Sequence, residues 1–162
     1  MAEQIRVLVT GACGKMGREV VKAIAATDDL RVTAAVDVAR VGEDAGEVAG
    51  LPALGVPVMA DLAAAIAAGA PRVLADFTRP DVIMDNLRIA LPRGVAAVVG
   101  TTGLTPANLD ELRELSAQGK APVFIAPNFA LGAVLMMQFA QQAAKYFDYA
   151  EVIEFHHEKK LD

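Results

Sequence analysis

Residues 5–17 read Ile-Arg-Val-Leu-Val-Thr-Gly-Ala-Cys-Gly-Lys-Met-Gly, and the architecture of the chain follows from them. The first six residues are mostly apolar and β-branched, which predicts a buried strand. A glycine-rich turn comes next. We then expect a helix over 16–26, because apolar residues recur at helical spacing at Met16, Val20, Val21, Ile24 and Ala25. A strand, a glycine turn and a helix in this order are the setting of a dinucleotide-binding fingerprint.

Three glycines, Gly11, Gly14 and Gly17, have separate predicted roles in this turn. Gly11 allows a sharp change of direction, and Gly14 allows backbone N–H groups to approach a pyrophosphate. Gly17 allows the helix to pack closely on the strand, and the helix N-terminus favours the negative charge. The spacing is G-x-x-G-x-x-G, one residue longer than the common G-x-G-x-x-G form. Because glycines also mark ordinary turns, this motif needs support from elsewhere in the chain.

Asp37 supplies that support. It lies near the end of a second predicted strand, over 31–38, and follows Gly17 by 20 residues. An acidic residue at this distance accepts hydrogen bonds from an adenine ribose in dinucleotide-binding folds. The alternative interpretation is that Asp37 is a turn residue at the end of a strand.

The composition indicates one domain, or one domain with part of another. The chain has 162 residues, 54% of them hydrophobic, and a formal net charge of −5. It has no apolar run of the roughly 20 residues that a membrane helix needs and no signal segment, so we expect a cytoplasmic protein without membrane contacts. The negative charge argues against nucleic-acid binding. Cys13 is the only cysteine, which argues against a disulfide framework and a cysteine-rich zinc site; it is a reactive thiol or a small residue that fits the loop.

Strands and helices alternate along the rest of the chain. Strand patterns cover 72–76, 94–99 and 122–126, with a possible short strand at 56–59. Helix patterns cover 62–68 after Asp61 as N-cap, 81–90 with Pro80 in the first turn, a segment capped by Thr105 with Pro106 at its first position, and a segment after Phe129 to about Tyr146. Residues 39–56 have no clear period, and we expect them to form a loop.

This order predicts an α/β fold, a doubly wound parallel sheet of the Rossmann type with helices on both faces. Ligands bind at the carboxyl ends of the strands in such sheets. Small and polar residues gather at those ends, in the segments Gly11–Gly17, Asp37, Phe77–Arg79, Gly100–Gly103 and Ala126–Phe129. We therefore expect a flat cofactor along this edge, although each segment taken singly is also consistent with a loop or with core packing.

Several of these segments resemble one family, the 4-hydroxy-tetrahydrodipicolinate reductases (dihydrodipicolinate reductases) of lysine biosynthesis through diaminopimelate. The matching segments are Val9–Gly17, Asp76–Pro80, Gly100–Gly103, Ala126–Phe129 and Glu154–Asp162, in family order. The last reads EFHHEKKLD and resembles the family's His-His-x-x-Lys-x-Asp signature, which is more specific than a glycine loop. The resemblance implies an oxidoreductase that transfers a hydride from NADH or NADPH to a small cyclic imine dicarboxylate.

The resemblance also implies roles for individual residues. The pyrophosphate would be held by Gly11, Gly14, Lys15, Met16 and Gly17, and the adenine ribose by Asp37. The nicotinamide side would be lined by Phe77, Thr78, Gly100, Thr102, Ala126 and Phe129. The catalytic residues would be His156, as general acid, and Lys160; the substrate would be bound by His157 and Lys160. Histidine suits this role because it titrates near neutral pH, whereas the residues alone also allow a surface histidine pair or an adventitious metal site, and we expect no metal.

The chain departs from the family pattern after Asp162, where the family continues into a Pro-Ser-Gly-Thr segment and a second, α+β domain that assembles a tetramer. We therefore expect residues 1–129 to form the dinucleotide-binding domain. Residues 130–162 would be a linking helix and the first strand of a truncated substrate domain. This chain is then expected to bind cofactor but to turn over poorly, while the full-length protein would be a homotetramer.

The choice of cofactor is the second open point. Asp37 would repel a 2′-phosphate, whereas Arg40 and Lys15 would tolerate one, and we expect NADH to be preferred. Two other functions also fit the fold: an aspartate dehydrogenase-like or sugar dehydrogenase-like enzyme, and a non-catalytic NAD(P)-sensing module. The histidine-lysine signature argues against both, since a sensor has no need of His156 and Lys160 together.

Overall fold

The structure is a computed structural model that describes residues 3–126, 128–153 and 155. The chain divides into two compact units, Met1–Ile125 and Ala126–Asp162. The assignment of residues 1–129 to a dinucleotide-binding domain, and of 130–162 to a linking helix and part of a second domain, stays a prediction. Within the described part of the chain, no helix is long and apolar enough to cross a membrane.

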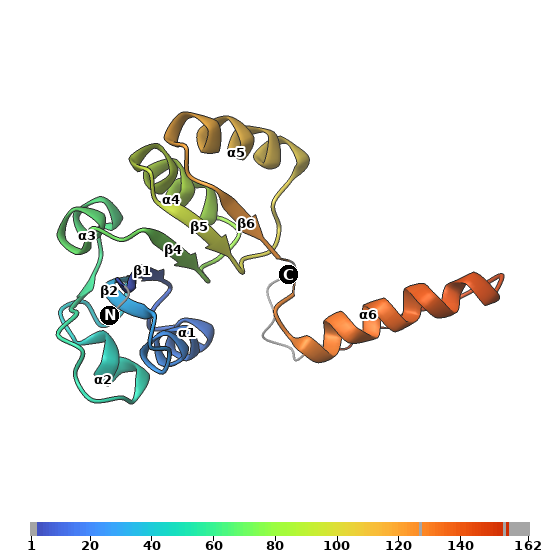
Figure 1. Cartoon of the computed structure of the whole chain (residues 1–162), viewed down its shortest axis with the longest axis horizontal. Coiled ribbons are helices and arrows are strands. Elements are labelled where there is room, and N and C mark those ends of the chain that lie inside the picture. Colours follow the sequence, from blue (N-terminus) through green and yellow to red (C-terminus); the bar gives the residue numbers. More distant parts are fainter. Residues whose placement is uncertain (1–2, 127, 154, 156–162) are drawn as a thin grey trace. The chain divides into compact units, whose positions relative to one another are not determined.

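The first unit is built on a six-stranded parallel sheet with the order β3-β2-β1-β4-β5-β6 (Figure 1). Its strands are β1 (Ile5–Thr10), β2 (Leu30–Val36), β3 (Val58–Met59), β4 (Val73–Asp76), β5 (Ala96–Val99) and β6 (Val123–Ile125). The chain runs outward from β1 to β3, then crosses to β4 and runs outward again. The strand order therefore reverses between β1 and β4, where doubly wound sheets bind their ligands, and the predicted fold class is confirmed.

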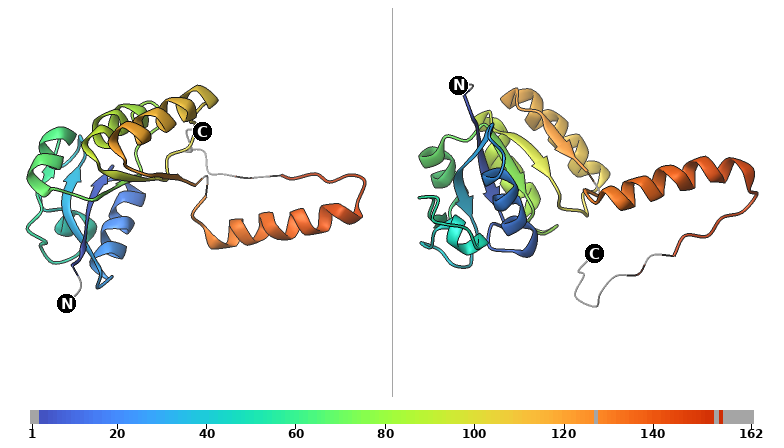
Figure 2. Two further views of the ribbon diagram at one scale, coloured as in Figure 1. Left: turned by 45° about the horizontal axis from the view of Figure 1, so that its top comes forward. Right: turned by 60° about the horizontal axis from the view of Figure 1, so that its bottom comes forward.

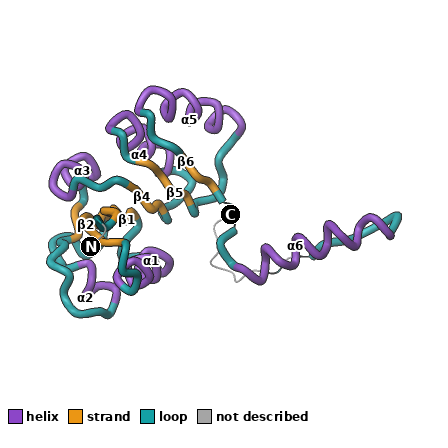
Figure 3. The backbone as a smooth tube through the Cα atoms, in the orientation of Figure 1, coloured by secondary structure: helices purple, strands orange, loops and turns teal. Residues whose placement is uncertain are grey.

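Helices cover both faces of this sheet (Figures 1 and 2), and Figure 3 shows the strands lying between them. One face packs against α1 (Lys15–Ala25) and α2 (Ala45–Ala49). The other packs against α3 (Leu62–Gly69), α4 (Ile83–Ala90) with the 3₁₀ turn η1 (Leu91–Arg93), and α5 (Pro106–Gly119). Each face has its own hydrophobic core, as a parallel sheet requires.

The strand β1 contributes to both cores. Its Leu8 lies in the core with α3, α4 and α5, whereas Val7 and Val9 lie in the core with α1 and α2. All three side chains are buried. Because successive strand residues point to opposite faces, a strand covered on both sides needs an apolar residue at each of these positions. This is why the run at the start of the chain predicts a central strand.

The expectation that residues 39–56 form only a loop is wrong, because α2 lies inside this segment. Asp44 is its N-cap: the carboxylate accepts the backbone N–H groups of Gly46 and Glu47, and also those of Leu54 and Val56. A helix of five residues is too short to show a helical period in its sequence. The sequence feature that could have predicted this helix is its N-cap residue, Asp44.

Two further boundaries differ from expectation. The helix predicted over 81–90 begins at Ile83, because the carbonyl of Arg79 accepts the N–H groups of Val82 and Ile83 and makes residues 80–82 a turn. The second strand ends at Val36, before Asp37. By contrast, Asp61 caps α3 and Thr105 caps α5, with Pro106 at the start of that helix, as predicted.

The second unit contains α6 (Leu131–Ala143) and the 3₁₀ turn η2 (Ala144–Tyr146), which confirms the helix predicted to reach about Tyr146. The segment expected to begin a strand at Tyr149 is not a strand over residues 149–153. A strand needs a neighbour to accept and donate its hydrogen bonds, and the described residues of this unit include no other strand.

Candidate cofactor-binding site

The glycine turn has the conformation that its sequence predicts. Gly11 has a φ of +69°, in the left-handed region, and a Cβ placed there would lie 2.7 Å from the carbonyl oxygen of Phe77. The N–H of Gly14 donates to the carbonyl of Gly11 over 3.0 Å. This hydrogen bond closes a tight turn over residues 11–14, which accommodates the additional residue of the G-x-x-G spacing.

Gly17 brings the first turn of α1 against this loop. A Cβ at Gly17 would lie 1.9 Å from the carbonyl oxygen of Gly11, a distance that no side chain tolerates. The close approach predicted for this glycine is therefore confirmed, although its contact is with the turn itself. Any residue larger than glycine at position 17 would push α1 away from the end of β1.

The N-terminus of α1 is suited to an anion. Its N-cap, Gly14, has no side chain, whereas the N-termini of α2, α3 and α5 are capped by Asp44, Asp61 and Thr105. Helix N-termini carry N–H groups without intrahelical partners and a partial positive charge. Since no acidic residue lies in the first turn of α1, these groups fit the pyrophosphate of a dinucleotide. Lys15, Met16 and Gly17 form that first turn.

A cavity of about 390 Å³ opens beside this turn in the first unit. It is lined by Thr10, Gly11, Gly14, Val36, Asp37, Val38, Ala60, Leu62, Phe77, Thr78, Arg79, Val82 and Asn86. Its size falls in the range of small-molecule sites. The fold thus brings together five of the predicted cofactor residues: Gly11, Gly14, Asp37, Phe77 and Thr78. A smaller cavity of about 210 Å³ between α5 and β6 contains none of the predicted site residues.

Asp37 joins the end of β2 to the glycine turn. Its Oδ2 accepts the backbone N–H of Cys13 over 2.9 Å, and its Oδ1 accepts the N–H of Ala39 over 2.9 Å. Asp37 therefore shapes a turn, as the alternative interpretation predicts, and it also lines the cavity. Its contact with an adenine ribose stays a prediction. Each carboxylate oxygen has two lone-pair positions, so both can also accept a ribose hydroxyl.

Cys13 is held beside Asp37. Burial is the main cause that raises the pKa of the Cys13 thiol, the negative charge of Asp37 adds to it, and Arg40 opposes it. The Sγ donates to the carbonyl of Ala39 over 3.2 Å. A thiol with a raised pKa is a poor nucleophile, because the thiolate is the reactive form. The structure favours the interpretation of Cys13 as a small residue that fits the loop.

Asp76, the last residue of β4, is the polar centre of the site. It is fully buried and accepts five hydrogen bonds from described residues. Oδ2 accepts from Thr10 Oγ1 and Asn86 Nδ2, each over 2.7 Å. Oδ1 accepts from the N–H of Thr78 over 3.0 Å, from its hydroxyl over 2.6 Å, and from Thr101 Oγ1 over 3.1 Å.

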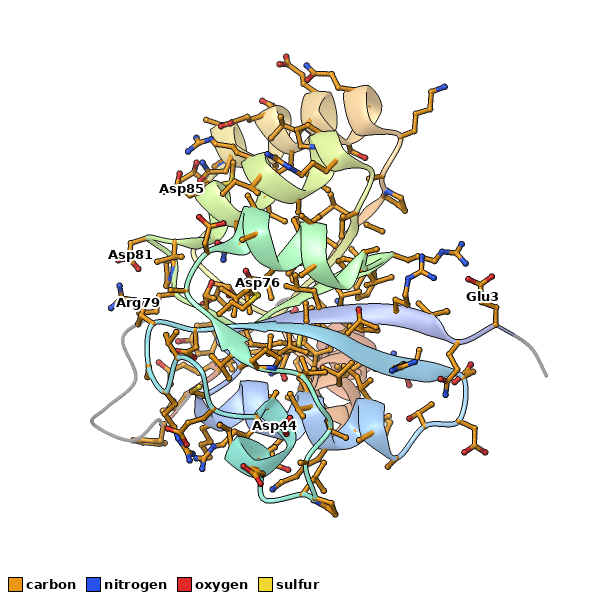
Figure 4. The ribbon with its side chains drawn as sticks, turned by 90° about the vertical axis from the view of Figure 1, so that its left-hand side faces the viewer. Glu3, Asp44, Asp76, Arg79, Asp81 and Asp85 are labelled. Atoms are coloured by element: carbon orange, nitrogen blue, oxygen red, sulfur yellow. The ribbon has the colours of Figure 1, made fainter. Side chains whose placement is uncertain are left out.

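This network stabilises a buried carboxylate with neutral donors. It joins the ends of β1, β4 and β5 to α4, and so fixes the segment after β4 that lines the cavity. Figure 4 shows Asp76 within the first unit, while Arg79 and Asp81 lie at its outside. The Arg79 guanidinium donates to Asp81 over 3.0 Å. Asp76, Thr10, Asn86 and Thr101 were not predicted as site residues.

Phe77 is positioned by two glycines, which follow the strands on either side of β4. Its carbonyl lies against Gly11, and its ring lies against Gly100, where a Cβ would be 2.1 Å from the ring atom Cε1. Gly100 follows β5, and its N–H donates to the carbonyl of Asp76 over 2.9 Å. The predicted residues Phe77 and Gly100 are thus in direct contact.

The remaining predicted residues have different outcomes. Thr102 lies in the loop after β5 and is half-buried. Ala126 and Phe129 belong to the second unit, so their part in the site stays a prediction. His156, His157 and Lys160 lie outside the described residues, and their catalytic and substrate-binding roles also stay predictions.

Comparison with known families and proteins identifies relatives over the whole chain. Residues 5–129 match the family described as "Dihydrodipicolinate reductase, N-terminus". The 4-hydroxy-tetrahydrodipicolinate reductase of Moorella thermoacetica is 48% identical over 162 residues, which cover 100% of this chain and 61% of that protein. The corresponding protein of Thermosynechococcus vestitus is 46% identical over 166 residues, covering 100% of this chain and 60% of that protein. The chain therefore spans about three fifths of the length of these relatives.

Comparison with solved structures finds a member of the same family and proteins of similar fold. The dipicolinate-bound dihydrodipicolinate reductase from Paenisporosarcina sp. TG-14 matches with a TM-score of 0.77 and 39% identity, over 98% of this chain and 60% of that one. A scyllo-inositol dehydrogenase from Lactobacillus casei, with bound NAD(H) and scyllo-inositol, has a TM-score of 0.65 and 17% identity, over 88% of this chain and 42% of that one. The second likeness shows a shared fold alone.

Proposed function

The chain belongs to the dihydrodipicolinate reductase family, and from this membership we propose that it supplies the cofactor-binding part of a 4-hydroxy-tetrahydrodipicolinate reductase. The reaction would be the NAD(P)H-dependent reduction of 4-hydroxy-tetrahydrodipicolinate to tetrahydrodipicolinate, a step of lysine biosynthesis. The observation that carries the proposal is the cavity between the uncapped N-terminus of α1 and Asp37, because it combines a phosphate site with a ribose acceptor in one crevice.

The residues around the cavity divide between the two ends of the cofactor. The N–H groups at the start of α1 would hold the pyrophosphate, with Lys15 and Met16 beside it. Asp37 would accept hydrogen bonds from the adenine ribose. At the other end, Phe77 and Thr78, fixed by Asp76, would line the nicotinamide side with Gly100 and Thr102, and Ala126 and Phe129 would complete it. When bound, the reduced nicotinamide would supply the hydride.

The proton and the substrate contacts would come from the signature segment. His156 would hold the proton that the reduced ring takes up, since imidazole titrates near neutral pH. Lys160 would bind a carboxylate of the cyclic imine dicarboxylate and offset its charge, and His157 would contact the same substrate. These three roles rest on the sequence resemblance.

We propose NADH as the preferred cofactor. A carboxylate beside the ribose accepts hydrogen bonds from both hydroxyls of NADH but repels the 2′-phosphate of NADPH. Val38, the residue after Asp37, is 93% exposed and offers no positive charge there. The family resemblance further supports a cytoplasmic location and a homotetramer for the full-length protein.

The test is NADH binding to the 162-residue chain, measured by titration calorimetry, for the unmodified chain and for Asp37→Ala. We expect Asp37→Ala to weaken NADH binding by about tenfold, since hydrogen bonds to a charged group contribute about 1.5–3 kcal/mol. Asp29→Ala is the control, because Asp29 is also an acidic residue near an end of β2 but is exposed and outside the cavity. Equal NADH affinity in both variants would contradict the placement of the ribose.

Turnover is measured on the same chain with the cyclic imine substrate and NADH. We expect binding of NADH with slow reduction or none, because the chain spans about three fifths of the length of its relatives. Near-normal turnover would contradict this expectation and leave the cofactor site unaffected. Absence of NADH and NADPH binding would contradict the proposed function itself.

A further inference from the structure

We infer that Glu43 is a determinant of cofactor choice. Its carboxylate forms an ion pair with the guanidinium of Arg40, which would otherwise be available to bind the 2′-phosphate of NADPH. The inference rests on the proposed function, in which an adenine ribose lies at Asp37. Glu43 is not one of the residues that line the cavity. According to this inference, the preference for NADH depends on the Arg40–Glu43 ion pair as well as on the carboxylate of Asp37.

The turn that carries the two residues is firmly built. The N–H of Glu43 donates to the carbonyl of Arg40 over 3.1 Å. The N–H of Gly42 donates to the carbonyl of Val58 over 2.8 Å, and the N–H of Val58 donates to the carbonyl of Glu43 over 2.8 Å. The turn is thus attached to β3 by two hydrogen bonds. Its backbone places the side chains of Arg40 and Glu43 on the same side.

The ion pair itself uses two donors of the guanidinium. Arg40 Nε and Nη2 both donate to Glu43 Oε2, over 3.0 Å and 2.6 Å. The hydrogen bond between them raises the pKa of Arg40 and lowers the pKa of Glu43. The Nε and Nη2 donors form one edge of the planar fork with which arginine binds a phosphate. Glu43 therefore occupies one of the edges through which the guanidinium could bind a 2′-phosphate, and its negative charge offsets the positive charge of Arg40.

Arg40 lies close to Asp37, and therefore close to the position predicted for the ribose and its 2′-phosphate. It follows Ala39, whose N–H donates to Asp37 Oδ1. Its positive charge also acts on the thiol of Cys13, the residue whose N–H donates to Asp37 Oδ2. The charged groups that act on Cys13 are Asp37, Arg40, Glu43 and Arg18. A phosphate at this place would meet two carboxylates, one paired guanidinium and Arg18.

Removal of the Glu43 charge should therefore change the ratio of the two cofactors. In Glu43→Gln we expect the affinity for NADPH to rise about threefold to fivefold, the upper part of the range for an exposed ion pair, while the affinity for NADH changes less than twofold. The backbone hydrogen bonds of the turn are kept in this variant. Glu47→Gln is the matched control: it removes one exposed negative charge on the neighbouring helix α2 without touching Arg40.

The double variant Arg40→Met/Glu43→Gln decides whether the gain passes through Arg40. We expect the gain in NADPH affinity to disappear in it, and to decrease with added salt in Glu43→Gln. Thermal unfolding of each variant confirms that the fold is retained. An unchanged NADPH-to-NADH ratio in Glu43→Gln, the same gain in Glu47→Gln, or a gain that survives without Arg40 would overturn the inference. If the unmodified chain binds neither nucleotide, the proposed function fails first.

Discussion

The side-chain amide of Asn86 donates to Asp76 Oδ2 over 2.7 Å and so ties α4 to the end of β4. Both residues border the place where the strand order reverses, and Asn86 also lines the cavity. The contact is one of only two that Oδ2 makes with the described residues, the other coming from Thr10. It therefore links the stability of the first unit to the shape of the cavity.

Substitution of Asn86→Leu should lower the stability of the first unit and weaken the binding of NADH. The buried carboxylate of Asp76 loses a hydrogen-bond donor, so we expect a loss of about 1–3 kcal/mol in the free energy of unfolding and a weaker affinity for NADH. Urea denaturation and NADH titration measure the two effects. Gln118→Leu, the same kind of change at an exposed position of α5, should leave both unchanged. Full stability in Asn86→Leu would show that Asp76 does not depend on this contact.

Gly100→Ala should displace the ring of Phe77. The added methyl would lie 2.1 Å from Phe77 Cε1, and such overpacking costs about 1–3 kcal/mol of stability. We also expect NADH to bind more weakly, and the second change Phe77→Leu to restore part of the stability. In the control Gly132→Ala, the methyl meets no atom of the described residues within 4 Å apart from its own helix backbone and chain neighbours. Equal thermal midpoints for the two alanine variants would contradict the contact.

Thr33→Val should stabilise the protein. Thr33 Oγ1 is buried and has no hydrogen-bond partner among the residues that the structure describes. Replacing the hydroxyl by a methyl of similar size removes this unsatisfied group, and we expect a gain of about 1 kcal/mol in chemical denaturation. The same substitution at Thr10, whose hydroxyl donates to Asp76, should instead be destabilising. A loss of stability in Thr33→Val is the result that contradicts the prediction.

The cap of α2 should make stability depend on pH. Burial alone would raise the pKa of Asp44, but hydrogen bonds from four backbone N–H groups together hold this pKa below its ordinary value. The contribution of Asp44 to stability is therefore complete above the pKa of the unfolded state, and it is lost as the pH falls through the lower folded-state pKa.

Urea unfolding between pH 7 and pH 2 tests this dependence. We expect Asp44→Ala to cost about 1–2 kcal/mol at pH 7, and the difference from the unmodified chain to shrink below about pH 4. Asp29→Ala, which removes an exposed carboxylate outside the cap of α2, is the control. A difference that stays constant across this pH range would mean that the charge of Asp44 contributes nothing to the cap.

The parts of the site that the sequence predicts are those with local signals. The strand before Gly11, the helix after Gly14 and the distance to Asp37 are all encoded within short windows, and the structure confirms their arrangement. The network of Asp76 escaped prediction because its donors come from Thr10, Thr78, Asn86 and Thr101, which only the tertiary fold brings together. The available signal was an aspartate at the end of an otherwise apolar strand, followed two residues later by a threonine.

The ion pair between Arg40 and Glu43 was not predicted from the sequence for a different reason. The sequence shows a cation near Asp37, and it suggests tolerance of a 2′-phosphate. The structure shows that this cation already has a partner three residues further along, in a turn where Arg40 and Gly42 both have left-handed backbone conformations, with φ of +55° and +89°. Turn geometry of this kind cannot be read from charge alone.

The two backbone hydrogen bonds of Asp37 have a consequence for how this protein can be re-engineered or can diverge. A substitution of Asp37 that admits a 2′-phosphate also removes the two hydrogen bonds that hold the loop proposed to bind the phosphates, so this single change should weaken the binding of NADH and NADPH alike. Selection for a different coenzyme will therefore favour changes in the neighbouring turn, and adaptive substitutions should accumulate there while the aspartate persists.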